Sequence, residues 1–364
     1  MGRQRIRKKI KFKKVYAVSI ILLIFLIGWG IYKASNFQKT NSYEIKGKID
    51  VNSVNYTLEK LGNDLLVFEK GRLKIFEGEE LKLEIERQGL IDPVLAVIKE
   101  NIYLIDKDSG NIEVLNNTGE TIKNFSIEEK IIGIKGDMSK QGISFHLRPA
   151  EDKEEIVFYD EKGENIGRTG NIMKGSIIDY HFDKENNKVI LSAIEHDKSL
   201  VNNIMILNMN QKIQSGKILK DEIALKTFLG KNKDSIVATK DKIIVSGEDN
   251  KIKWEKGMEI DKIDYNYDLG ILVVCKEGLD KTQVTILDES SNILYKGSIS
   301  GKIKGISPSK EGFLLRGQRT IGLASNNDLI EIKFNKDVLW SAIMNHNTMA
   351  IGNNKNIEMI DLIR

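Results

Sequence analysis

The stretch NIYLIDKDSGNIEVL, Asn101–Leu115, contains two apolar segments separated by a turn of small and acidic residues. Ile102 and Leu104 alternate with their neighbours before the turn, and the apolar pattern resumes at Ile112. Alternation on both sides of an Asp, Ser and Gly turn is typical of a β-hairpin. Similar hairpins recur to the end of the chain, so this stretch predicts the fold, although it indicates no activity.

The hairpins repeat at a regular spacing. Aligned on the first apolar residue before each turn, the eight hairpins begin at Leu73, Ile102, Ile156, Ile204, Ile243, Val284, Ile321 and Ile357. The successive spacings are 29, 54, 48, 39, 41, 37 and 36 residues, with a mean of about 41. A period near 40 with several short strands and no long helical pattern predicts a β-propeller with four strands per blade.

Polar or small residues mark the turns of this repeat. They lie four positions after each marker, at Glu77, Asp106, Asp160, Asn208, Gly247, Asp288, Ser325 and Asp361. Asn and Asp recur there because turns use them.

The two ends of the repeat region complement each other. The last hairpin ends at Arg364 without an outermost strand, and Tyr43–Ile49 is a strand without a partner of its own. Pairing the two would close a ring and remove exposed sheet edges. The sequence therefore predicts an all-β propeller of about eight four-stranded blades over residues 43–364. Seven blades is one alternative, because residues 50–101 are the least regular, and an open β-solenoid, whose repeats are normally shorter, is the other.

The N-terminus predicts a membrane anchor. Residues 1–14 carry eight basic side chains and no acidic one, and residues 15–32 carry no charge. Eighteen helical residues span about 27 Å, close to the thickness of a bilayer core. A cleaved signal peptide would have a shorter apolar segment and a small-residue cleavage site. We therefore expect a cytoplasmic basic tail (1–14), a transmembrane helix (15–32), a linker (33–42) and an extracytoplasmic propeller (43–364), in a single-pass protein of the cell membrane.

Charge and cysteine content exclude several classes of protein. Of the 56 Lys and Arg residues, eight lie in the tail, which leaves 48 against 52 acidic residues. The bulk of the chain thus lacks the basic character of a nucleic-acid-binding protein, and we expect no nucleic-acid partner. The single cysteine, Cys275, lies in an apolar segment and is expected to be a buried strand residue.

No motif in the chain assigns a catalytic, cofactor-binding or metal-binding residue. The turn Asp106–Gly110 suggests a calcium loop, but its glycine is fifth rather than sixth and its twelfth residue is Asn117, so a hairpin turn is favoured. The carboxylates at Asp183–Glu185 and Asp152–Glu155 are expected to be solvated loop residues. The four histidines are far apart in the sequence and match no metal-binding motif: they are His146, His181, His196 and His346.

The repeats resemble quinoprotein-type (PQQ- or WD40-like) repeats, in which a strand, an Asp-x-x-Thr-Gly-like turn and an aromatic-ended strand follow one another. Asp106–Gly110 matches that turn best and Asp160–Gly163 less well, while Trp254 and Tyr295 stand at the aromatic position. The anchor followed by a propeller also resembles a bacterial family of membrane-anchored propellers of unknown function. Trp occupies the aromatic position in a single repeat, so we expect no quinone cofactor.

These observations favour a binding or scaffolding module at the bacterial cell envelope rather than an enzyme. The expected partners are the cytoplasmic membrane, through the N-terminal helix, and an envelope protein or wall polymer. The alternative is an envelope enzyme, a hydrolase or a quinone-cofactor oxidoreductase, with its site at the propeller channel. Convergent ionisable groups around a deep channel pocket would favour the enzyme, and an apolar patch on one face would favour the binding module.

Overall fold

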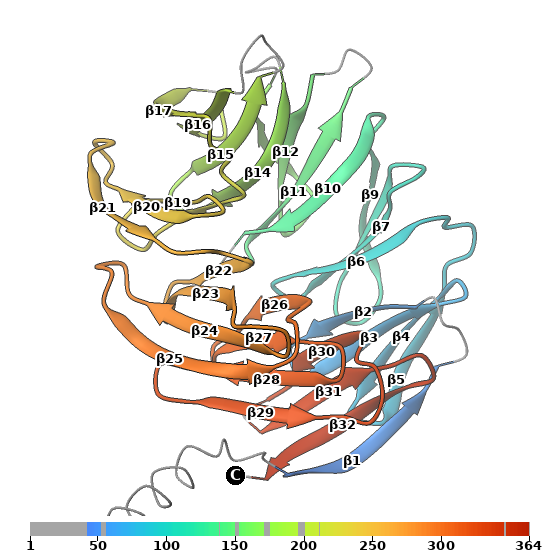
Figure 1. Cartoon of the computed structure of the whole chain (residues 1–364). Coiled ribbons are helices and arrows are strands. Elements are labelled where there is room, and N and C mark those ends of the chain that lie inside the picture. The colour runs from blue at the N-terminus through green and yellow to red at the C-terminus, as the bar shows by residue number, and fades with distance from the viewer. Residues whose placement is uncertain are drawn as a thin grey trace, which may run out of the picture. The chain divides into compact units, whose positions relative to one another are not determined.

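The computed structural model describes residues 42–51, 56–137, 139–149, 153–170, 175–195, 201–210, 212–345 and 347–363. These residues form 32 strands arranged in eight four-stranded antiparallel sheets (Figure 1). The prediction of an all-β, eight-bladed propeller is confirmed. The predicted tail, transmembrane helix and nearly all of the linker lie outside the described residues. Within the described part of the chain, no helix is long and apolar enough to cross a membrane.

Seven of the eight blades are meanders of four consecutive strands, in which sequence order equals spatial order. The first four blades are β2 (Tyr56–Leu61), β3 (Asp64–Glu69), β4 (Arg72–Glu77) and β5 (Glu80–Glu86); β6 (Pro93–Ile98), β7 (Asn101–Asp106), β8 (Asn111–Leu115) and β9 (Thr121–Ser126); β10 (Lys130–Gly136), β11 (Gly142–Arg148), β12 (Glu155–Asp160) and β13 (Asn165–Arg168); and β14 (Ser176–Asp183), β15 (Lys188–Glu195), β16 (Val201–Leu207) and β17 (Ile213–Lys220).

Three further blades repeat this order, and the eighth combines both ends of the propeller. They are β18 (Lys226–Leu229), β19 (Ser235–Ala238), β20 (Lys242–Ser246) and β21 (Ile252–Gly257); β22 (Lys262–Asn266), β23 (Gly270–Lys276), β24 (Lys281–Leu287) and β25 (Ile293–Ser300); β26 (Gly305–Pro308), β27 (Phe313–Arg316), β28 (Thr320–Ala324) and β29 (Leu329–Lys333); and β30 (Trp340–Ile343), β31 (Thr348–Gly352), β32 (Asn356–Ile363) and β1 (Ser42–Asp50).

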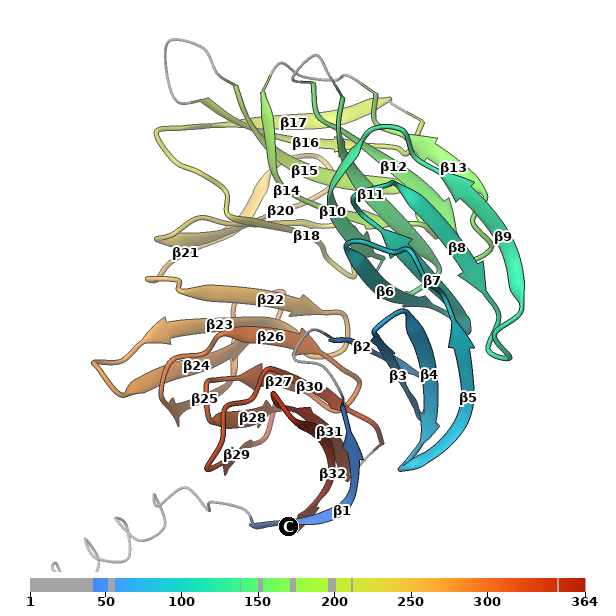
Figure 2. The same cartoon turned by 90° about the vertical axis from the view of Figure 1, so that its right-hand side faces the viewer.

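The predicted closure of the ring is present. β1 pairs antiparallel with β32 from Ser42↔Ile363 to Asp50↔Asn356, so the first described strand is the outermost strand of the last blade. Figure 1 shows the two side by side, β1 in blue and β32 in red. The first strands of neighbouring blades contact one another, as β2 does β6 and β14 does β18, which places them around the centre (Figure 2).

The core is divided among the interfaces between blades. Eight clusters of buried apolar residues are found, and each joins the facing sides of two neighbouring blades. The cluster between blades 4 and 5, for example, joins Ile204 and Ile206 to Val237 and Ile244. Strands packed on both faces by adjacent blades have continuous apolar runs, as in Ile271–Val274, whose residues belong alternately to the two neighbouring clusters.

One repeat marker was assigned to the wrong strand. Seven of the eight markers lie on the third strand of their blade, but Ile102 lies on β7, the second strand of blade 2. The equivalent residue is Ile112 on β8, which changes the spacings of 29 and 54 to 39 and 44 residues. The stretch Asn101–Leu115 is therefore the middle hairpin of its blade, and the irregularity of the first repeats disappears.

The recurring Asx residues organise the turn between the third and fourth strands. In this turn, the Oδ1 atom accepts hydrogen bonds from the backbone N–H groups two and four residues later. Asn116, Asp160, Asn208 and Asp288 all have this pattern, with distances of 2.8–3.1 Å. These side chains fix the turn by local hydrogen bonds, which explains their recurrence in the sequence.

Antiparallel pairing gives the propeller two distinct faces. Turns between the second and third strands lie on the same face as the connections from one blade to the next, and we call this the blade-linking face. The other turns lie on the opposite face, where β1 begins at Ser42 and β32 ends at Ile363; we call this the entry face. The connections between blades are short, so every blade starts from the blade-linking face.

Candidate functional site

Four ionisable residues from the innermost strands of consecutive blades form a charged network. They are Lys135 on β10, Asp179 on β14, Lys226 on β18 and Asp264 on β22. The Asp179 carboxylate lies 2.6 Å from Lys135 Nζ and 3.2 Å from Lys226 Nζ. The network therefore joins the inner strands of blades 3, 4 and 5 by direct ion pairs, and Asp264 is coupled to it electrostatically.

Asp179 has little capacity left for a ligand. It is 5% exposed, and besides the two lysines it accepts the backbone N–H of Thr227 at 2.8 Å and its hydroxyl at 3.4 Å. Lys135 also donates to the backbone oxygen of Tyr180 at 2.8 Å, and its Nζ lies 4.5 Å from the centroid of that ring. Burial lowers the pKa of Lys135, while the Asp179 charge opposes this effect. A buried carboxylate with this many donors is expected to hold blades together.

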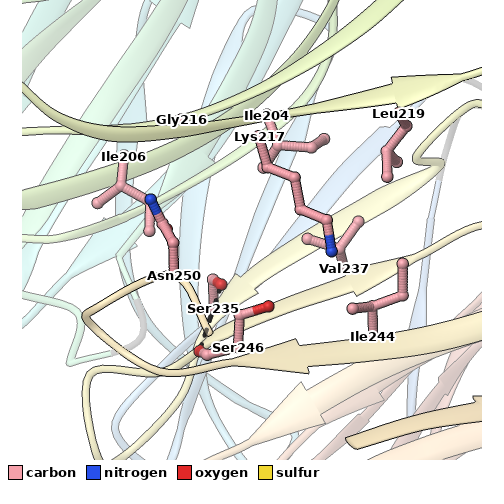
Figure 3. A pocket seen from close by; sticks show the side chains of 10 residues that line it. All are labelled: Ile204, Ile206, Gly216, Lys217, Leu219, Ser235, Val237, Ile244, Ser246 and Asn250. Carbon is pink, nitrogen blue, oxygen red and sulfur yellow. Dashed lines mark hydrogen bonds between the residues drawn. The ribbon is translucent and has the colours of Figure 1, made fainter. Parts of the chain in front are cut away.

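Asp264, the fourth residue of the network, has a raised pKa. Burial raises the pKa of its carboxyl to about 6, although the backbone N–H of Tyr265, which Oδ1 accepts at 2.8 Å, and the Lys226 charge favour the ionised form. Such a group can exchange a proton near neutral pH, as general acid–base catalysis requires. Two cavities, one near Glu154 and one near Lys217 (Figure 3), are not lined by Asp264.

The described histidines do not converge. His146 on β11 contacts Glu154 at 2.9 Å through Nε2, and His181 on β14 accepts the backbone N–H of Leu229 at 3.3 Å through Nδ1. Burial lowers the pKa of His146 and lowers that of His181 to about 4, so both rings are neutral at pH 7. His196 and His346 lie outside the described residues.

A second buried carboxylate, Glu154, lies where blades 3 and 4 meet at the blade-linking face. It accepts hydrogen bonds from Arg148 at 2.7 Å and from the backbone N–H of Ile177 at 2.8 Å, in addition to the contact with His146. Burial raises the pKa of Glu154, but these donors outweigh it and hold the pKa below its usual range. Glu154 also lines one of the cavities, together with Thr169 and Leu191. All of these contacts join adjacent segments, as a structural ion-pair network does.

The turn Asp106–Gly110 is a hairpin turn between β7 and β8, as predicted. Asp106 is 1% exposed and accepts the backbone N–H of Asp92 at 3.0 Å and the hydroxyl of Ser109 at 2.7 Å. Gly110 has φ +72°, and a Cβ there would lie 2.0 Å from the backbone oxygen of Ile127. Asp106 thus fixes the turn through hydrogen bonds, and Gly110 allows the close approach of the Ile127 backbone. No group of three or more potential metal ligands occurs among the described residues.

Two other residue sets considered from the sequence also have structural roles. Cys275 lies on β23 and is half-buried against the cluster between blades 5 and 6, and burial raises its pKa. Asp183, in the acidic segment Asp183–Glu185, accepts the backbone N–H of Asn186 at 3.0 Å and the hydroxyl of Tyr267 at 3.1 Å. In the segment Asp152–Glu155, Asp152 lies outside the described residues, and Glu154 and Glu155 are buried, so the expectation of solvated loop residues is wrong for these two.

The residues of the inner-strand network were not identified from the sequence. No short motif contains them, because they are separated by about one repeat: 44 residues from Lys135 to Asp179 and 47 from Asp179 to Lys226. A charged residue at the same place in successive inner strands was the available signal. Detecting it requires the strand register that only the structure supplies.

The two faces differ in their exposed apolar residues. Four large apolar side chains in loops are well exposed, with exposed fractions of 45–101%, and all four lie on the blade-linking face: Ile91, Leu225, Leu279 and Leu339. Among the described turns of the entry face, none carries a large apolar residue that is exposed to this degree. Ile213, Ile252, Ile293 and Ile363 are 49–54% exposed at strand ends on the entry face, so the difference between the faces lies in their loops.

These features define a class: a closed eight-bladed β-propeller whose buried charges are largely paired internally and whose blade-linking face is apolar in its loops. Residues 36–362 match the family of unknown function DUF5711, and because this match covers most of the chain, the chain belongs to that family. The predicted resemblance to a propeller family of unknown function is thereby confirmed. A search of curated protein sequences found no match.

Solved structures with the same fold are distant in sequence. The crystal structure of BamB from Moraxella catarrhalis aligns with a TM-score of 0.56 and 8% identity, covering 88% of this chain and 100% of that chain. The computationally designed Ika8 protein aligns with a TM-score of 0.59 and 13% identity, covering 90% and 100%. At these identities the likeness shows the propeller fold.

Proposed function

We propose that this protein is a binding or scaffolding module of the bacterial cell envelope that recognises a protein partner through its blade-linking face. The observation that carries the proposal is the distribution of exposed loop residues. Ile91, Leu225, Leu279 and Leu339 lie on that face, and Leu279 is 101% exposed at the tip of the turn between β23 and β24. Exposed aliphatic residues around a rigid scaffold provide the apolar core of an interface.

The buried charged groups support a binding role over a catalytic one. Asp179 and Glu154 are each surrounded by donors from their own chain, which leaves them little capacity to act on a substrate. The expected location follows from the sequence: residues 15–32 anchor the protein in the membrane and place the propeller outside. The chain enters the propeller at the entry face, and the blade-linking face lies at the other end of the blades.

Site-specific crosslinking in intact cells tests the face and the location together. A photoreactive amino acid would replace Leu279 or Ile91 on the blade-linking face, and Asn63 or Asp268 on the entry face as matched controls. We expect discrete protein adducts from the first pair and not from the second. Protease added to wall-stripped cells should digest the propeller. Adducts confined to the entry face would contradict the proposed surface, and full protection from protease would contradict the proposed location.

A further inference from the structure

The loops of the blade-linking face carry opposite charges on two neighbouring arcs of the ring. From the connection between blades 4 and 5 to the turn in blade 6, all but one of the exposed charged loop residues are acidic: Asp221, Asp241, Glu259, Asp261, Glu277 and Asp280, with Lys240 as the exception. From the connection between blades 6 and 7 round to the turn in blade 1, the exposed charged residues of the described loops are all basic: Lys302, Lys304, Arg319, Lys355 and Lys70. Lysines at the adjoining strand ends lower the net charge of the acidic arc, and Lys242 pairs with Glu222 at 2.8 Å. The difference between the arcs therefore lies in the loops.

The four exposed apolar loop residues of this face form two pairs about one line through the ring. Leu279 lies in blade 6 and Leu339 in the connection between blades 7 and 8, so the midpoint between them falls just before blade 7. Leu225 lies in the connection between blades 4 and 5 and Ile91 in that between blades 1 and 2, so their midpoint falls at blade 7. A line from the centre of the ring to this side of blade 7 thus relates each apolar residue to another one.

The same line exchanges the two charged arcs. Asp261, in the connection between blades 5 and 6, lies as far before the line as Lys355, in blade 8, lies after it. Asp221, in the connection between blades 4 and 5, is related in the same way to Lys70 in blade 1. A face on which apolar groups match apolar groups and acids match bases about one line is complementary to a copy of itself turned over about that line.

We propose that the partner bound at the blade-linking face is a second copy of this chain, in a face-to-face dimer whose two-fold axis follows this line. The inference rests on the proposed function, because it names the partner of the same surface. Leu279 contacts Leu339 of the partner subunit, Asp261 pairs with Lys355 of the partner subunit, and the symmetry repeats both contacts. An unrelated partner would not require the apolar and the charged groups to share one axis, so the shared axis favours a second copy.

The place where the chain enters the propeller suits two copies held in one membrane. β1 is the outermost strand of blade 8, little more than one blade from the axis. A two-fold rotation about the axis leaves blade 8 of both copies on the same side of the dimer. Both chains therefore enter from one side, as two copies anchored through residues 15–32 in the same membrane require.

Crosslinking between two differently tagged full-length copies in intact cells tests the dimer. One copy carries a photoreactive amino acid at Leu279, and the matched control carries it at Asp268 on the entry face. We expect an adduct with both tags, attached at the connection between blades 7 and 8 of the second copy, and none from the control. Adducts that join the chain only to a different protein would overturn the dimer and support the proposed face. No adduct from Leu279 would contradict both proposals.

Charge reversal tests the axis. Asp261 and Lys355 are both exposed, so their replacement should leave the fold intact. In the dimer, Asp261→Lys or Lys355→Glu in both copies places like charges together at two symmetric contacts, and each should lower the yield of the two-tag adduct at least about threefold.

A mixed pair, with Asp261→Lys in one copy and Lys355→Glu in the other, has opposite charges at both contacts and should recover the wild-type yield. Asp268→Lys on the entry face is the control and should leave the yield unchanged. A mixed pair that crosslinks as poorly as the two single variants would overturn the proposed axis.

Discussion

At the scale of single residues, Asp264 should make stability depend on pH. Its carboxyl has an ordinary pKa near 4 in the unfolded chain, and burial raises it to about 6 in the folded protein. Between these values the folded state binds more protons than the unfolded state, so the free energy of unfolding falls as the pH rises through this window. Asp264→Asn removes this penalty and should stabilise the protein by about 1–3 kcal/mol more at pH 7 than at pH 4.

Urea unfolding of the wild-type chain and the Asp264→Asn variant at both pH values provides the measurement. Asp261→Asn is the matched control, because Asp261 is an exposed carboxylate at the start of the same blade. It should change the free energy of unfolding equally at the two pH values. A variant of Asp264 with no pH-dependent gain would show that this carboxyl is ionised in the folded protein well below pH 6.

The sequence predicted the role of turn residues better than that of buried charges. Asp160, Asn208 and Asp288 act on their own turns, so a local pattern is sufficient to identify them. Asp179 instead interacts with Lys135 and Lys226 from two other blades. Such contacts depend on the register of strands that are far apart in the sequence, and no local pattern contains that information.

At the scale of elements, most of the outermost strands contain an irregularity that disfavours pairing of their exposed edge with another chain. Seven of the eight, all except β29, have a register shift in their pairing with the third strand. A bulge twists an edge strand and interrupts its row of unpaired backbone groups, which disfavours pairing with another chain. This explains how Ile213 and Ile252, both about half exposed, are tolerated on the rim of the propeller.

The misassigned marker at Ile102 shows a limit of pattern reading at this scale. Both β7–β8 and β8–β9 are apolar strands joined by a turn of Asp or Asn with Gly, so each satisfies the hairpin pattern. Which hairpin is the outer one depends on its neighbours in the ring. The eight-blade count was nevertheless correct, because one marker per blade was found even where the strand was wrong.

The closing strand β1 should contribute strongly to stability. It buries Ile49 against blade 1, and the ring of Tyr43 packs against Phe334 with centroids 5.0 Å apart. Burial of the Ile49 side chain alone is worth about 1.5–3 kcal/mol, and removing β1 also exposes the edge of β32. We expect a chain lacking residues 1–50 to be less stable than one lacking residues 1–41 by at least about 3 kcal/mol. Equal urea midpoints for the two truncated chains would contradict a role for β1 in ring closure.

At the scale of the whole molecule, stability is distributed evenly around the ring. Each of the eight interfaces has its own apolar cluster, and no single cluster of the described residues is common to all blades. The natural chain opens between the third and fourth strands of blade 8, where Ser42 and Ile363 are paired neighbours. In a repeat architecture the units contact only their neighbours. Which blade contains the chain break should therefore affect stability less than whether the break falls within a blade or between two blades.

Circular permutation tests this property. Joining Ile363 to Ser42 by a short linker and opening the chain between Gly78 and Glu79 moves the break to the equivalent turn of blade 1. A Cβ at Gly78 would meet nothing within 4 Å, so the cut falls in an open turn; the neighbouring Glu79 accepts the backbone N–H of Lys48 at 3.2 Å in an exposed hydrogen bond. We expect this permuted chain to fold with a free energy of unfolding within about 2 kcal/mol of the parent, since the length of a surface connection changes loop entropy only slowly.

The matched permutation opens the chain between Gly301 and Lys302, in the connection from β25 to β26. In this permuted chain every blade consists of four consecutive strands. No blade is therefore completed by a strand from the opposite end of the chain. The ring is then closed by side-chain packing between blades 6 and 7 without backbone hydrogen bonds across the break, and local separation of these blades costs less. Urea unfolding should therefore show a clearly lower midpoint for this permuted chain than for the one opened at Gly78. Equal midpoints would mean that the shared blade contributes nothing beyond the packing common to all eight interfaces.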